Sequence, residues 1–274
     1  MVNVLGVKMA GKSGSLSSKY IPHFYVIVED ELAKAVIDCL CEDNQSFARK
    51  YILSGAWSNQ ASCLYGFFTY GLALIDIRIP SFGIIAVVDG DYSENEILKR
   101  INTFIKGDHK NDDQKKIIEM ISDSVVSFHL EFEPSKISGL PEYNHKKWLE
   151  EITEEKIHQT HKEGGKEFLR GAREISSMLE LVDFSKSISE SHPSIFGKKG
   201  GLDYHGYYEI IKNNFRASNI DHKINNIIWY VLNCIKHYNK EKWRMYTSVV
   251  DEKIRKLYEN HRIRFTESKF DFRT

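Results

Sequence analysis

Two short runs of apolar residues stand out along the chain and predict buried β-strands. They are Phe24–Val28 (FYVIV) and Gly83–Val88 (GIIAVV), and neither contains a charged residue. Strands that are apolar throughout are typical of parallel sheets, in which helices cover both faces. Each run ends directly at an acidic residue, Glu29 in the first case and Asp89 in the second.

The residues after the first run repeat with a helical period. Leu32, Val36 and Leu40 fall on one face, which predicts a helix with acidic residues at its N-terminus, where the helix dipole favours negative charge. Similar patterns predict further elements before residue 135. The expected strands are Lys50–Leu53, Leu72–Ile79 and Val125–Phe132, and the expected helices cover 58–70, 93–106 and 112–122. This alternation indicates an α/β fold, with a parallel sheet flanked by helices.

The pattern changes near residue 135. Pro134, Gly139 and Pro141 interrupt it, and from Lys146 onward the spacing is helical except for the segment 192–203 (HPSIFGKKGGLD). We therefore divide the chain into three parts. Residues 1–20 are a flexible polar lead-in, residues 21–137 form the α/β unit, and residues 138–274 form a mainly α-helical C-terminal region.

Composition and charge reduce the number of possible functions. Lys and Arg number 38, as do Asp and Glu, and the zero net charge argues against a simple DNA-coating protein. A nuclease is compatible with this balance, because acidic metal ligands offset basic contacts to a strand. Without a long apolar run or the apolar core of a signal peptide, we expect a cytoplasmic protein with no membrane association. The cysteines match no zinc spacing and are expected to be free: Cys39, Cys41, Cys63 and Cys234.

Acidic residues follow both apolar strands. Glu29 follows the first, and Asp89 and Asp91 follow the second, with Gly90 between them. The carboxyl ends of neighbouring parallel strands share one edge of the sheet, so we expect these carboxylates to converge. Crowded carboxylates repel one another unless a divalent cation neutralises them, and hard oxygen ligands favour Mg²⁺ or Mn²⁺. Each motif alone is also compatible with an ordinary turn or helix N-terminus.

Together the two motifs resemble the Toprim domain of topoisomerases, primases and OLD-type nucleases. They are FYVIVEDE, which ends at Glu31, and IIAVVDGD, which ends at Asp91. The resemblance covers roughly residues 22–135, and the VEDE sequence is similar to OLD-like ATPase–nuclease proteins in particular. It implies a Toprim-like sheet in which Glu29, Asp89 and Asp91 bind Mg²⁺ (or Mn²⁺) and catalyse the reaction, with Glu31 as an additional ligand.

The same resemblance implies a function. We expect a Mg²⁺-dependent endonuclease that cuts DNA or RNA phosphodiesters as the effector of an anti-phage defence system. OLD-type proteins include an ATPase, and Gly6–Ser13 fits the letters of a phosphate-binding loop, but poor helix formers follow it. We therefore expect the ATPase to be a separate partner subunit, with nucleic acid as the substrate and a homo-oligomer as a further assembly.

Other charged residues are candidates for supporting roles. The resemblance to OLD-type nucleases implies acids after the Asp-Gly-Asp strand, and Glu133 and Glu142 are the candidates for a second metal ion or an auxiliary role. Lys198 and Lys199 lie among glycines in FGKKGG and are candidates for contacting phosphate. Ordinary surface positions are the alternative for all four residues.

Two other interpretations of the acidic motifs remain open. A receiver-type signalling domain also has an acidic pair after its first strand, and Asp76 in LIDIRIP resembles its phosphoacceptor. A non-catalytic partner subunit would keep the fold without the activity. Asp76 in the acidic crevice would favour the receiver, whereas Asp89 and Asp91 there would favour the nuclease.

The histidines and aromatic residues add little to this picture. His205, beside Asp203, is expected to be structural or at the surface. The segment 204–215 (YHGYYEIIKNNF) is rich in aromatic residues and contains Lys212, with Arg216 next to it. Such a segment either grips a single strand or contributes aromatic side chains to the core or to a partner interface, and we favour the second interpretation.

Overall fold

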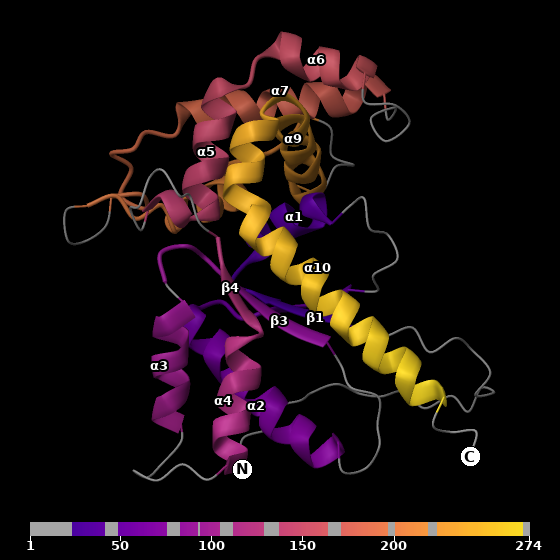
Figure 1. The fold of residues 1–274 in the computed structure, drawn as a ribbon. Coiled ribbons are helices and arrows are strands. Elements are labelled where there is room, and N and C mark those ends of the chain that lie inside the picture. The colour runs from indigo at the N-terminus through magenta and orange to yellow at the C-terminus, as the bar shows by residue number, and fades with distance from the viewer. Residues whose placement is uncertain are drawn as a thin grey trace, which may run out of the picture.

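The computed structural model describes residues 24–41, 49–75, 83–92, 94–104, 112–128, 137–163, 171–196, 201–218 and 224–270. At its centre is a four-stranded parallel sheet in the order β2-β1-β3-β4 (Figure 1). The strands are β1 (Phe24–Val28), β2 (Arg49–Leu53), β3 (Gly83–Val88) and β4 (Val125–Ser127). The expected parallel α/β sheet is confirmed, and the two apolar strands, β1 and β3, are neighbours.

Helices cover both faces of the sheet, and this explains why its central strands are apolar throughout. Side chains alternate along β1, so that Val26 and Val28 join one core and Ile27 joins the other. The first core contains α1 (Glu31–Leu40). The second core lies beneath α2 (Trp57–Ile75), α3 (Glu94–Phe104) and α4 (Asp112–Ser122).

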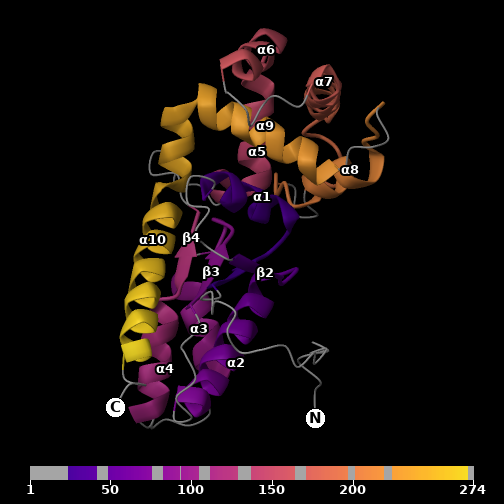
Figure 2. The same ribbon diagram turned by 90° about the vertical axis from the view of Figure 1, so that its right-hand side faces the viewer.

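Further helices follow β4 in the described part of the chain. They are η1 (Ile137–Gly139), a 3₁₀ turn, and then α5 (Pro141–Glu151), α6 (Glu154–Glu163), α7 (Gly171–Ser187), α8 (Gly206–Asn214), α9 (Ile224–Tyr238) and α10 (Lys240–Phe270). α9 packs on α1, and the long α10 runs beside β3 and β4 (Figure 2). These helices share one hydrophobic core with α1, so they are packed on the α1 side of the sheet.

One expected strand is wrong. The strand expected from Leu72 to Ile79 overlaps α2, which continues as a helix to Ile75. An apolar run of this kind fits either a buried helix or a buried strand, and its period does not distinguish them. Here Ala61, Leu64 and Phe68 pack onto the sheet from α2. Residues 76–79 lie outside the described residues.

Several broader expectations are tested by burial. Tyr204, Tyr207 and Phe215 are buried in the helical core, as expected for the aromatic-rich segment. All four cysteines are free thiols, three of them buried. Among the described helices, none has the length and apolar character needed to cross a membrane.

A backbone contact between Gly90 and Gly139 joins the end of β3 to the start of α5. The amide of Gly90 donates to the carbonyl oxygen of Gly139 at 3.0 Å, and the Tyr246 hydroxyl donates to the same oxygen, also at 3.0 Å. A Cβ on either glycine would collide with backbone atoms of the other, and one on Gly90 would also meet the Phe128 carbonyl. The two segments approach this closely only because both residues lack a side chain.

We expect Gly90→Ala and Gly139→Ala each to lower the free energy of unfolding by about 2 kcal/mol or more, because backbone must shift to admit the methyl group. The matched control is Gly66→Ala in α2, where an added Cβ meets nothing within 4 Å. That change is expected to stabilise the helix by up to about 1 kcal/mol. Urea denaturation followed by circular dichroism measures all three. A Gly139→Ala variant as stable as the parent would contradict the contact.

Candidate functional site

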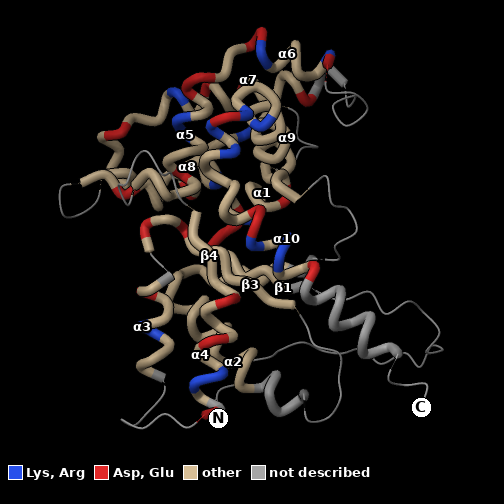
Figure 3. Tube along the Cα trace, in the orientation of Figure 1, with Lys and Arg blue, Asp and Glu red and all other residues tan. Residues whose placement is uncertain are grey.

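The acidic residues after β1 and β3 lie at the point in the sheet where the strand order reverses, between these two neighbouring strands. The chain leaves β1 through α1 toward β2, and it leaves β3 through α3 and α4 toward β4. The helices that follow these two neighbouring strands cover opposite faces of the sheet. In open α/β sheets, the crevice at the carboxyl ends of such strands is the usual ligand-binding position. Acidic positions gather there, between the sheet and helices α1, α5 and α8 (Figure 3).

The local structure after β1 holds Glu29 at this crevice. Asp30 caps α1, and its side chain accepts a hydrogen bond from the amide of Ala33 at 2.8 Å. In the turn after β2, the amide of Gly55 donates a hydrogen bond to the carbonyl oxygen of Glu29 at 2.8 Å. Burial raises the pKa of the Glu29 carboxyl, and Asp91 and Asp30 add to the rise while His205 opposes it. Glu29 therefore belongs to a group of interacting carboxylates.

Asp89 and Glu142 form the buried centre of this group. Asp89 is 1% exposed and Glu142, from the first turn of α5, is 3% exposed. Within the described structure, neither oxygen of Asp89 has a hydrogen-bond partner, nor do Oε2 of Glu142 and Oδ1 of Asp91. Burial raises the pKa of both Asp89 and Glu142 well above the ordinary values, and neighbouring carboxylates raise them further. Buried carboxylates without partners are costly, so a cation is the natural complement.

His205 brings a positive charge to the same place. It precedes α8, and its Nε2 lies 3.3 Å from Oδ2 of Asp91 while its Nδ1 lies 4.0 Å from Oε1 of Glu142. The hydrogen bond to Asp91 is the main reason that the pKa of His205 is raised to about 9, against the opposing effect of burial. His205 is therefore a functional candidate, although we expected it to be structural or at the surface. Its partner Asp91 lies in a distant part of the sequence, and no local motif marks the pair.

The structure describes some of the expected site residues and not others. Glu29, Asp89 and Asp91 come together, and Glu142 joins them from the helical layer. Glu31 is adjacent but is engaged elsewhere, since its Oε2 accepts from the Tyr208 hydroxyl at 3.0 Å and lies 4.0 Å from Nζ of Lys212. The following lie outside the described residues: Glu133, Lys198, Lys199, Asp76 and the segment Gly6–Ser13.

The donor chemistry of the cluster fits a hard divalent cation. Its unpartnered atoms are carboxylate oxygens, which Mg²⁺ and Mn²⁺ prefer. As the side chains stand, no three His, Cys, Asp or Glu residues of the described chain surround a common metal position. Binding an ion therefore requires these carboxylates to close around it.

No family model, curated protein or solved structure matches this chain. The resemblance to Toprim domains is thus carried by the two short motifs around Glu29 and Asp89. What the site does has to follow from the chemistry of its own side chains.

The raised pKa values of Asp89 and Glu142 make stability depend on pH. The folded state keeps these protons at pH values where the unfolded chain, with ordinary pKa values of 3.8 and 4.5, has lost them. The free energy of unfolding of the metal-free protein should therefore fall as pH rises from about 4 toward neutrality. Asp89→Asn and Glu142→Gln should weaken this dependence. Thermal melts across that pH range measure it.

At pH 7 we expect each of these amide variants to raise the melting temperature of the metal-free protein by roughly 2–4 °C, or about 1 kcal/mol. Mg²⁺ should stabilise the parent, because it binds the folded state, and should stabilise the variants less. The control is Asp123→Asn. Asp123 is exposed and lies just before the N-terminal end of β4, whereas the acidic site lies at the carboxyl ends of the strands. Variants that melt below the parent and keep its full Mg²⁺ response would refute the metal-binding role of these carboxylates.

Proposed function

We propose that this protein is a Mg²⁺-dependent endonuclease that cuts phosphodiester bonds in DNA or RNA. The observation that supports it most is the group of buried carboxylate oxygens without hydrogen-bond partners, at the carboxyl ends of β1 and β3. Such a group destabilises the fold, so its presence points to a function that requires it. Binding a divalent cation for phosphoryl chemistry is the function that suits acids in this position.

In this proposal the carboxylates of the site are the metal ligands. Glu29, Asp89 and Asp91 bind Mg²⁺, and Glu142 completes the ligand set from α5. When bound, the ion polarises a phosphoryl oxygen and lowers the pKa of a bound water. Asp89 and Glu142 are nearly inaccessible to solvent, so their charges act on the ion with little screening. His205, which contacts Asp91, is the accessible member of the group, with a side chain that is 45% exposed.

Further parts of the proposal follow from the Toprim resemblance. The sheet is then a Toprim-like domain, and the following helices are its accessory region. The OLD-like VEDE motif suggests a defence effector that works with a separate ATPase subunit. Nothing in the described residues distinguishes DNA from RNA as the substrate, so both belong in the assay.

A phosphoacceptor domain is the second candidate, and the strand order favours it. The order β2-β1-β3-β4 matches the start of the doubly wound order that receiver domains share. Asp89 directly follows the third strand, which ends at Val88, so Asp89 and not Asp76 would be the acceptor. Against this function, Asp89 is 1% exposed and Asp91 and Glu142 crowd it, whereas a phosphoacceptor must reach its phosphodonor. Incubation with acetyl phosphate and intact-mass analysis tests it directly.

In the cleavage assay, purified protein is incubated with plasmid DNA or total tRNA, with Mg²⁺, with Mn²⁺ or with EDTA. We expect cleavage only with the metal, and a loss of at least about 100-fold in Glu29→Gln, Asp89→Asn and Asp91→Asn. Asp123→Asn is the control and should cut as the parent does. If the three variants cut at the parental rate, the site assignment is wrong. If calorimetry detects no divalent ion binding, the mechanism is wrong as well.

A further inference from the structure

Three polar side chains face the acidic site, one from the residue that precedes α8 and two from α8 itself. His205, Tyr208 and Lys212 follow one another at helical spacing, so they lie on one face of α8. His205 contacts Asp91, and the Tyr208 hydroxyl donates to Glu31. Nζ of Lys212 lies 3.5 Å from Glu209 on its own helix and 4.0 Å from Glu31. From His205 to Lys212 is about 10 Å at about 1.5 Å per residue. The face therefore begins at the proposed metal ligands and extends away from them.

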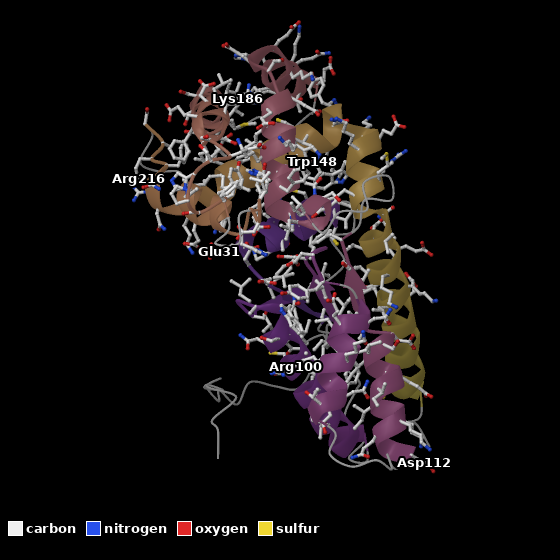
Figure 4. All side chains as sticks on the ribbon, turned by 90° about the vertical axis from the view of Figure 1, so that its left-hand side faces the viewer. Glu31, Arg100, Asp112, Trp148, Lys186 and Arg216 are labelled. Carbon is white, nitrogen blue, oxygen red and sulfur yellow. The ribbon has the colours of Figure 1, made fainter. Side chains whose placement is uncertain are left out.

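The packing of α8 keeps this face directed toward the strand ends. On its other side, Tyr207 and Ile211 are buried in the helical core. His205 and Lys212 remain accessible, with side chains 45% and 44% exposed. In Figure 4, Glu31 and Arg216 lie along the same edge of the molecule, whereas Asp112 of α4 lies far from both. The cationic groups thus form part of the surface beside the acidic site.

The backbone on both sides of His205 is tightly constrained. Tyr204 has a φ of 56°, a left-handed conformation that is strained for a bulky residue. It is held there by burial, by its hydrogen bond to Glu190 and by edge-to-face packing on Tyr143. Gly206, on the other side, sits against Ser194 so closely that a Cβ would collide with its carbonyl. A strained residue kept beside a charged one indicates that the position of His205 is important.

We propose that α8 is the substrate-binding helix of this protein and contacts the phosphate backbone of a nucleic-acid strand. His205 contacts the phosphate next to the metal site, and Lys212 contacts a phosphate further along the same strand. Glu31 is then a positioning residue, which holds Lys212 and Tyr208, and not a metal ligand. The identity of the ligand rests on the proposed function.

The charges and spacing of α8 suit this role. A site made of carboxylates repels a phosphodiester, so cations at its edge are needed to bring the strand in. The span of about 10 Å is about three times the rise of about 3.4 Å between neighbouring bases of one strand, so His205 and Lys212 face different phosphates. The two side chains therefore reach two phosphates of one strand, and together they set its direction across the metal site.

The test measures binding without cleavage. A fluorescein-labelled single-stranded oligonucleotide is titrated in Ca²⁺, and the anisotropy is followed at several salt concentrations. We expect Lys212→Gln to weaken binding about fivefold at 0.1 M salt and to reduce the salt slope by about 0.7, the effect of losing one phosphate contact. His205→Gln moves the donor next to the metal site and should also weaken binding about fivefold. The double variant should lose about 25-fold, since the two sites are far enough apart to act independently.

Two controls separate charge from folding. Lys116→Gln removes an exposed lysine from α4, away from the site, and should bind as the parent does. His205→Lys keeps an N–H donor at this position and should keep most of the affinity. Thermal melts confirm that each variant is folded before it is titrated.

The outcomes also distinguish this proposal from the nuclease function. It is overturned if the parent does not bind the oligonucleotide, or if His205→Gln and Lys212→Gln bind as the parent does. If binding depends on α8 as expected but Mg²⁺ and Mn²⁺ support no cleavage, the nuclease function fails and the nucleic-acid contact stands.

Discussion

The close approach of Gly90 and Gly139 is the constraint on which the rest of the site depends. It brings the turn after β3 against the start of α5, so that a residue of the helical layer can reach the carboxyl end of the sheet. Glu142 lies three residues after Gly139, so this contact helps to place it in the acidic group. Tyr246 of α10 secures the same carbonyl and stacks on Phe128, so three segments meet at one backbone oxygen. A side chain on either glycine would hold these segments apart.

The buried carboxylates lower the stability of the metal-free fold, although they are the groups that the proposed function needs. Folding places Asp89 and Glu142 out of reach of water and close to other carboxylates, which disfavours their charged forms. His205 compensates in part, because it is charged and lies beside Asp91 and Glu142. The unpartnered oxygens that remain are what a divalent cation would satisfy. Proteins commonly accept such a cost at a functional site, where the same groups would otherwise be replaced by neutral ones.

A parallel sheet of this kind supports many activities, so the fold alone does not identify this one. The distinguishing features come from the helical layer. Glu142 adds a fourth carboxylate, His205 a cation, and α8 a polar face that leads away from the crevice. The sheet thus supplies a position for binding an ion, and the helices supply the side chains around that position, which determine the ligands that can bind there.

The sequence by itself determined the sheet and the position of its acids. The apolar runs FYVIV and GIIAVV predict strands buried on both faces, and residues that directly follow such strands must lie at the sheet edge. Only the tertiary structure decided which other residues join Glu29, Asp89 and Asp91. Glu142 was one candidate among several acids, His205 was expected to be structural or at the surface, and Glu31 contacts Tyr208. Local patterns specify elements and their ends, whereas contacts between residues distant in the chain depend on how the layers pack.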